Sequence, residues 1–302
     1  MKRAVSISIG SSKRDKRAEI TLLGETVLLE RIGTDGDMEK AARLFQELDG
    51  KVDAFGVGGT DLALRVGKKT YPLHSVQSLV RFVRHTPVVD GGGLKNTLEH
   101  RLAAFLESRI GDYIRASGGK KALITSSADR WGMAASFAEA GYETVFGDLM
   151  FGLGLPLPLH TLRSVEIMAA LLLPVVGRLP FEWLYPTGEK QDEWVPKWEK
   201  YYRWATVIAG DCHYVKRHLP RQLEGKVIVT NTTVPADVAR FQEAGIKYLV
   251  TSTPLLDGRT FGTNMMEAAL VAVAGKGRPL SEDELNAYLD QLGLEPQIQA
   301  LN

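Results

Sequence analysis

Short apolar stretches alternate with amphipathic stretches along the chain, a pattern that predicts alternating strands and helices. The strand-like stretches end in glycine or small polar residues and cover residues 4–9, 18–33, 52–59, 62–73, 86–93, 121–127, 142–148, 206–211, 226–232 and 247–254. The helix-like stretches carry apolar residues three or four positions apart and cover residues 34–50, 75–85, 94–117, 132–141, 235–245, 264–275 and 281–293. Alternation of this kind favours mostly parallel sheets covered by helices on both faces.

A glycine pair, Gly118-Gly119, ends the longest predicted helix, and beyond it strands and helices alternate more regularly. The length of 302 residues suits two domains. We therefore predict an α/β fold with a smaller N-terminal α/β substrate domain over residues 1–117. A C-terminal Rossmann-like nucleotide-binding domain with a mostly parallel sheet follows over residues 118–302.

Local signals mark several helix ends. Asp35 or Asp37 is a suitable N-cap for the helix predicted over residues 34–50, and Ser281 with Glu284 forms a capping-box pattern. The most apolar stretch, residues 149–185, is interrupted by prolines, and its longest clean run is shorter than the ~20 residues of a membrane span. This stretch predicts a buried helix or a subunit interface. A homodimer is therefore possible, and no membrane partner is expected.

Charge and cysteine content narrow the classes of function. The chain has 37 Lys and Arg against 36 Asp and Glu, so its formal net charge is +1. Proteins held to nucleic acid mainly by charge carry a large excess of bases, so we expect no nucleic-acid partner. A single cysteine, Cys212, excludes an internal disulfide framework and an all-cysteine zinc site. Together with an N-terminus that lacks an apolar signal-peptide core, this predicts a cytoplasmic protein without a metal site.

A strand–loop–helix–strand pattern over residues 122–148 resembles the layout of a dinucleotide-binding unit. The loop between the first strand and the helix offers hydroxyls, charges and one glycine for a pyrophosphate: Ser126, Ser127, Asp129, Arg130 and Gly132. Asp148 ends the second strand about 20 residues further on, where an acid binds the ribose of NAD and disfavours NADP. The motif G-x-G-x-x-G is missing, so an ordinary strand–helix–strand unit without a nucleotide is the alternative.

Polar residues also follow three later strands. Asp211 and His213 follow the strand at 206–209, Asn231 follows the next, and Thr253 follows the last. Since ligands bind beyond the carboxyl ends of parallel strands, we expect these residues at one site, with Asp211 and His213 in proton transfer. Asn231 and Thr253 are expected to contact the cofactor. Each loop taken alone is equally typical of an ordinary turn.

In the N-terminal half, three glycines follow Asp90, and Lys95 lies in the first turn of the next helix. A cation there is unfavourable next to the helix dipole, so an anionic partner is expected close by. We predict that Asp90 pairs with Lys95 in the empty protein and that both belong to the catalytic site. A turn that merely needs glycine is the alternative. Residues 56–61 (GVGGTD) carry a weaker form of the same pattern.

The motifs SISIGSSKRD, RIGTDGDMEKA, VVDGGGLKNTLE, YPTGEKQ and GRTFGTNMMEA resemble a bacterial family labelled quinate/shikimate 5-dehydrogenase-like, over nearly the whole chain. The resemblance implies an oxidoreductase with a C-terminal nucleotide domain. Shikimate dehydrogenases themselves carry a glycine-rich turn, an N-V-T-x-P-x-K motif and a Lys–Asp catalytic pair. Here the turn reads SSADRWG, the second motif is missing, and only Lys95 is placed to supply the lysine.

These observations predict an oxidoreductase that uses NAD, or NADP, on a small polar or anionic hydroxy or keto substrate between the domains. Under this prediction Lys95 donates a proton to the substrate oxygen. Two alternatives remain: a non-catalytic nucleotide- or metabolite-binding protein, and an actin-like phosphotransferase suggested by GSSKRD and GVGGTD. The latter fold normally has a carboxylate after its first strand, where this chain has Gly10-Ser11.

Overall fold

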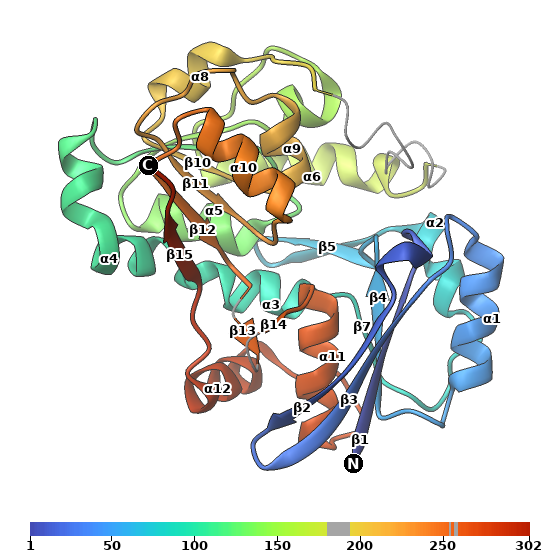
Figure 1. Cartoon of the computed structure of the whole chain (residues 1–302). Helices are drawn as coiled ribbons and strands as arrows, with labels where there is room; N and C mark the ends of the chain where they lie inside the picture. Colours follow the sequence, from blue (N-terminus) through green and yellow to red (C-terminus); the bar gives the residue numbers. More distant parts are fainter. Residues whose placement is uncertain (180–193, 254, 257–258) are drawn as a thin grey trace.

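The structure, a computed structural model, describes residues 1–179, 194–253, 255–256 and 259–302. The chain forms two α/β domains, each built around a mostly parallel sheet, as predicted (Figure 1). The motif at residues 185–191 and the end of the apolar stretch at 149–185 lie partly or wholly outside the described residues.

The first sheet has the order β2-β3-β1-β4-β7, and only β2 runs antiparallel to its neighbour. Its strands are β1 (Lys2–Ser8), β2 (Lys16–Leu22), β3 (Glu25–Gly33), β4 (Ala54–Gly58) and β7 (Val88–Val89). Alternate side chains face opposite sides: Ala4 and Ala54 pack on α11 (Thr263–Ala274), whereas Val5 and Phe55 pack towards α1 (Met38–Leu48) and α2 (His74–Gln77). A small hairpin, β5 (Ala63–Val66) and β6 (Lys69–Pro72), extends from this domain.

The second sheet has the order β15-β12-β11-β10-β8-β9, and only β15 runs antiparallel. Its strands are β8 (Lys121–Ile124), β9 (Glu143–Phe146), β10 (Val207–Ala209), β11 (Val227–Thr230), β12 (Tyr248–Thr251) and β15 (Gln297–Ala300). The helices α4 (Leu102–Ala116), α5 (Trp131–Glu139) and α6 (Leu162–Val176) share a core with one face. The other face packs on α8 (Glu199–Trp204), α9 (Cys212–Arg217) and α10 (Pro235–Glu243). This is a doubly wound sheet whose order reverses between β8 and β10.

The chain passes between the domains three times. It leaves the first domain through α3 (Gly92–Thr97) and returns through the short hairpin β13 (Leu255–Leu256) and β14 (Arg259–Thr260) to α11, which lies against β1, β3 and β4 (Figure 1). After α12 (Glu282–Leu292) it crosses again to add β15 beside β12. In packing, α4 belongs to the second domain and α11 to the first, which differs from the predicted division at residue 118.

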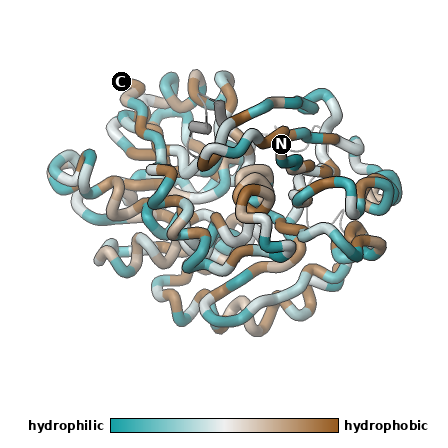
Figure 2. Tube along the Cα trace, turned by 90° about the horizontal axis from the view of Figure 1, so that it is seen from below, coloured by the Kyte–Doolittle hydropathy of each residue, from teal (hydrophilic) through white to brown (hydrophobic). Residues whose placement is uncertain are grey.

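Several predicted helix ends are confirmed by side-chain hydrogen bonds. Asp37 accepts from the backbone N–H of Lys40 at 2.8 Å and caps α1. At α12, Ser281 and Glu284 exchange the two bonds of a capping box, at 3.3 and 2.8 Å. Hydrophobic and hydrophilic residues alternate along the outer helices, as the sequence pattern requires (Figure 2).

Two predicted helices are shorter than expected, each because a side chain captures backbone groups. The backbone N–H groups of Arg84, His85 and Thr86 donate to the carboxylate of Asp49, so the helix predicted over residues 75–85 stops early. The helix predicted over residues 94–117 is divided into α3, a 3₁₀ turn at Glu99–Arg101 and α4. Near the break, the hydroxyl of Thr97 donates to the Gly93 carbonyl at 2.8 Å, a bond that bends helices.

The apolar stretch before the undescribed residues is only partly buried. In α6, Val165, Ala169 and Leu173 face the core, while Leu171 and Val175 are 70% and 64% exposed. No helix in the described part of the chain is long and apolar enough to cross a lipid bilayer.

Candidate functional site

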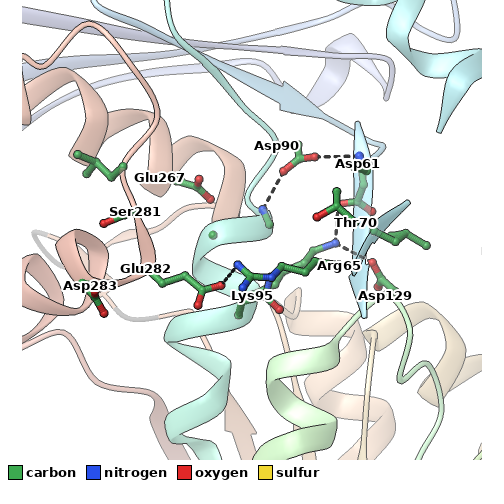
Figure 3. Close-up of a pocket in the computed structure, with 16 residues that line it drawn as sticks. Asp61, Arg65, Thr70, Asp90, Lys95, Asp129, Glu267, Ser281, Glu282 and Asp283 are labelled. Carbon is green, nitrogen blue, oxygen red and sulfur yellow. Dashed lines mark hydrogen bonds and ion pairs between the residues drawn. The ribbon is translucent and has the colours of Figure 1, made fainter. Parts of the chain in front are cut away.

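A cavity of about 510 Å³ opens where the hairpin β5–β6, α3, α11, α12 and the loop after β8 meet (Figure 3). Its wall carries more negative than positive groups. The carboxylates are Asp61, Asp90, Asp129, Glu267, Glu282 and Asp283, and the cations are Arg65 and Lys95. Both domains contribute to this wall, so a cavity lies between the domains, and its negative charge disfavours the anionic members of the expected polar or anionic substrates.

Lys95 lies at the centre of the site, between two carboxylates from different domains. Its Nζ is 2.6 Å from Oδ1 of Asp61, after β4, and 2.7 Å from Oδ1 of Asp129, after β8 (Figure 3). Lys95 and Asp61 are each only 8% exposed. Burial would lower the pKa of Lys95, but the two carboxylates outweigh it and hold the pKa above its usual value. Lys95 therefore stays protonated, which argues against the proton-donating role predicted for it.

The pKa values of the two carboxylates that contact Lys95 are shifted in opposite directions. Burial raises the pKa of Asp61 to about 7, and the pull of Lys95 only partly opposes this. Asp129 is also buried, yet Lys95 and Arg130 together hold its pKa at about 2. Of the two carboxylates, Asp61 therefore takes up a proton more readily, and Asp129 keeps its negative charge more readily.

Arg130 connects this cluster to the carboxyl edge of the second sheet. Its guanidinium is 2.5 Å from Oε1 of Glu99 and 2.9 Å from Oδ2 of Asp211. Asn231 also donates to Oδ2 of Asp211, at 2.9 Å, and Ser252 donates to Oε1 of Glu99, at 3.1 Å. The loops after β8, β10, β11 and β12 therefore meet, as predicted, but their polar groups bind one another.

The predicted partner of Lys95 is wrong. Asp90 does not pair with Lys95. Its Oδ2 accepts from the backbone N–H of Leu62 at 2.7 Å. Its Oδ1 accepts from the backbone N–H of Gly92 at 2.9 Å (Figure 3). These bonds fix the loop before α3 and so position Lys95. The anionic partners that the helix dipole called for are present, but they come from residues 34 positions away on either side.

Asp211, His213, Asn231 and Thr253 line neither this cavity nor a neighbouring one of about 380 Å³. Asp211 and Asn231 belong to the Arg130 network, and Asp211 also caps α9. His213 is exposed, and Thr253 is buried, with its hydroxyl donating to the Asn231 carbonyl at 3.2 Å. The expectation that these four residues share one cavity with Asp90 and Lys95 is therefore wrong.

The predicted dinucleotide loop is closed on itself. Oδ1 of Asp148 accepts from the backbone N–H of Ala128 at 2.8 Å, and Ser126 accepts from that of Asp211 at 3.4 Å. Ser127 is fully buried. The side chain of Arg130, 3% exposed, bridges the loops after β8 and β10, which is the switch point where a nucleotide would bind.

Helix packing also covers the N-terminus of α5. A Cβ on Gly132 would lie 2.2 Å from the carbonyl oxygen of Lys95, so this glycine allows α3 and α5 to approach closely. No pyrophosphate could take that place without moving α3. The residues predicted for NAD or NADP thus do not fit a dinucleotide bound at this loop.

Sequence reasoning missed two buried acids of the site. Asp61 ends the GVGGTD motif, in which the sequence pattern is weak. Glu267 is the one acid within the apolar run of α11. Glu267 is 4% exposed, and Oε2 accepts from the backbone N–H of Leu94 at 3.2 Å. Burial raises its pKa to about 8, so it is largely neutral at pH 7. A charged residue inside an otherwise apolar helix was the available signal.

Two family models match the chain on either side of the loop that precedes α3. Residues 3–90 match a "Domain of unknown function (DUF8753)", and residues 93–301 match a "Domain of unknown function (DUF8754)". The chain belongs to the DUF8754 family. The DUF8754 region supplies Lys95, Asp129 and Glu267 to the cavity, while Asp61 and Asp90 come from the preceding DUF8753 region. The site is therefore complete only when both regions are present.

No curated protein matches the DUF8754 chain in sequence. Among solved structures, a putative malic enzyme (malate oxidoreductase) is similar with a TM-score of 0.40 and 13% identity, over 94% of this chain and 75% of that one. The glucose-galactose binding protein GanP from Geobacillus stearothermophilus has a TM-score of 0.39 and 11% identity, over 99% and 97%. An NAD-dependent malic enzyme from Thermotoga maritima has a TM-score of 0.38 and 14% identity, over 94% and 75%.

Proposed function

We propose that this protein is an enzyme that binds a small hydroxyl- or amine-bearing molecule in the interdomain cavity and moves a proton through Asp61. The observation that carries the proposal is the buried Asp61–Lys95–Asp129 cluster on the wall of a 510 Å³ cavity. Perturbed, mutually coupled charges in a cleft are typical of catalytic sites.

Each member of the cluster has a distinct part in this proposal. Asp61, with its pKa near 7, accepts the proton of a substrate hydroxyl or ammonium and returns it later in the cycle. Lys95 keeps its proton and donates hydrogen bonds, holding Asp61 in place and stabilising negative charge on a substrate oxygen. Asp129 stays ionised and fixes Lys95 from the second domain.

The charge of the wall selects the ligand class. Six carboxylates face two cations, and with Asp61 and Glu267 protonated four carboxylates still remain. Both cations are already paired, Lys95 with Asp61 and Asp129, and Arg65 with Glu282. An anion would enter this field at a cost, whereas a cation or a neutral polyol would not. Of the polar or anionic substrates expected from the sequence, the proposal therefore keeps the polar ones and drops the anionic ones, which include quinate and shikimate.

The oxidoreductase predicted from the sequence is a narrower form of this proposal. Removal of hydride from an alcohol would require a base for the hydroxyl proton and an acceptor for the hydride, and Asp61 on the cavity wall supports only the first requirement. The Lys–Asp pairing also agrees with the resemblance to the dehydrogenase-like family. The residues assigned to NAD or NADP bind one another instead, so the loop gives the cofactor no support. NAD and NADP therefore stay predictions from the sequence alone. Thermal shifts with NAD, NADP, ATP and ADP separate this form from the nucleotide-binding and phosphotransferase alternatives.

The binding step is tested by ligand-observed NMR with ethanolamine, which carries both an amine and a hydroxyl, against L-malate, quinate and shikimate. We expect ethanolamine to bind, more tightly at pH 8 than at pH 6 as Asp61 ionises, and the anions to bind more weakly. Asp61→Asn should weaken ethanolamine binding at least tenfold and reduce its pH dependence. Asp112→Asn, which removes an exposed carboxylate on α4, is the matched control and should bind like the wild type.

Two results would overturn the proposal. One is equal ethanolamine affinity in wild type and Asp61→Asn. The other is tighter binding of malate or quinate than of ethanolamine. Binding that is lost in Asp61→Asn, but without turnover on any alcohol or amine supplied with NAD or NADP, would favour the non-catalytic alternative over the dehydrogenase.

A further inference from the structure

A second cavity of about 380 Å³ adjoins the first. The two share three wall residues, Arg65 on β5, Asn96 on α3 and Glu282 at the start of α12. Arg65 and Glu282 form an ion pair across this shared wall (Figure 3). The two cavities are thus neighbours, and the Arg65–Glu282 pair forms part of the wall between them.

The dividing ion pair is weak by its environment. The side chains of Arg65 and Glu282 are 44% and 39% exposed, and pairs this accessible contribute little to stability. Each side chain also has another favourable interaction available. Arg65 can pair with a ligand, and the carboxylate of Glu282 is stabilised by the helix dipole because it lies in the first turn of α12. A ligand that fills both cavities therefore displaces this contact at small cost.

The second cavity has a different chemical character from the first. Its wall carries as many arginines as carboxylates, Arg65 and Arg101 against Glu139 and Glu282, and His100 lies 3.0 Å from Glu139. The large side chain on its wall is Trp131, the first residue of α5, which is partly buried. The wall is mostly polar with its charges matched, and the indole of Trp131 offers a face on which a planar group can stack.

We propose that the two cavities form one bipartite site. An amine- or hydroxyl-bearing head binds at Asp61 and Lys95, and a planar, preferably aromatic, group extends past the Arg65–Glu282 pair to Trp131. This inference rests on the proposed function for the position of the head and adds the class of the substrate's second half. The substrate is then an aryl-substituted amino alcohol or a molecule of similar build.

The test compares ethanolamine with three aryl-extended forms of it: 2-amino-1-phenylethanol, N-benzylethanolamine and N-(2-phenylethyl)ethanolamine. Affinities are measured by ligand-observed NMR and, where tight enough, by calorimetry. In the wild type the best of the three should bind roughly tenfold tighter than ethanolamine, the gain expected from an aromatic contact with some burial. The linker length that gives the largest gain in affinity over ethanolamine indicates the distance from the head-binding position, past the ion pair, to Trp131.

Variants assign the gain to Trp131. Trp131→Ala should reduce the aryl gain to below twofold with ethanolamine affinity unchanged, and Trp131→Phe, which keeps a ring, should retain most of it. Glu282→Gln weakens the divider and should increase the gain. Phe82→Ala removes an aromatic ring that is 37% exposed outside both cavities and is the control for a general effect of aromatic loss.

The outcomes separate this inference from the proposed function. If ethanolamine binds and requires Asp61, but no aryl form binds tighter or the gain survives in Trp131→Ala, the bipartite site is wrong and the proposed function stands. If neither ethanolamine nor any aryl form binds, the proposed function fails and the bipartite site with it.

Discussion

Removing the guanidinium of Arg130 tests whether the buried charge network holds the two domains' site together. Arg130 is 3% exposed, and its partner Glu99 is completely buried. In Arg130→Met, Glu99 keeps only the hydroxyl of Ser252, while Asp211 still has the amide of Asn231. Removing one member of a buried ion pair leaves an uncompensated charge, and we expect a loss of about 3–5 kcal/mol in the free energy of unfolding.

The loss of unfolding free energy in Arg130→Met should depend on pH, because Arg130 affects the pKa of Glu99. Burial already holds the pKa of Glu99 above its usual value, and Arg130 opposes that rise. Without Arg130 the pKa rises further, so the folded state gains a proton that the unfolded state releases. Stability of the variant should therefore fall as pH rises, and the cost of Arg130→Met should be smaller at pH 5 than at pH 8.5.

Urea unfolding followed by circular dichroism at pH 5, 7 and 8.5 measures these costs. Adding Glu99→Gln to Arg130→Met should restore about 2 kcal/mol at pH 8.5, because the buried carboxylate is gone. The control is Arg109→Met, in which the exposed pair with Glu295 is lost and about 0–1 kcal/mol is expected. A cost for Arg130→Met no larger than that of the control, or one independent of pH, would refute the reasoning.

Three further changes test other parts of the structure. Gly132→Ala would place a Cβ 2.2 Å from the Lys95 carbonyl and should destabilise by about 1–3 kcal/mol, whereas Gly152→Ala, with nothing within 4 Å, should be nearly neutral in thermal unfolding. Glu267→Gln removes a carboxylate whose pKa is raised to about 8. The wild type should lose up to about 5 kcal/mol more stability than this variant between pH 5 and pH 9, measured by urea unfolding. Ser281→Ala removes the N-cap of α12 and should cost about 1 kcal/mol, seen as a lower melting temperature.

The sequence by itself determined the local structure and the fold class. Strand and helix periods predicted most elements of both sheets, and the caps at Asp37 and Ser281 were readable because a cap bonds within three or four residues of itself. Where local reasoning failed, a distant group intervened. Asp49 takes the backbone N–H groups of residues 84–86 and ends a helix that the apolar pattern alone would continue.

Only the tertiary structure decided the composition of the site. Lys95 was predictable as a cation that needs an anion, but nothing near it in sequence distinguishes Asp90 from Asp61 or Asp129 as that anion. The choice follows from the packing of α3, which meets the loop after β4 in the first domain and the loop after β8 in the second. Both carboxylates are buried, and it is the second cation beside Asp129, Arg130, that separates a raised pKa at Asp61 from a lowered pKa at Asp129. That arrangement depends on the packing of both domains and not on residue type.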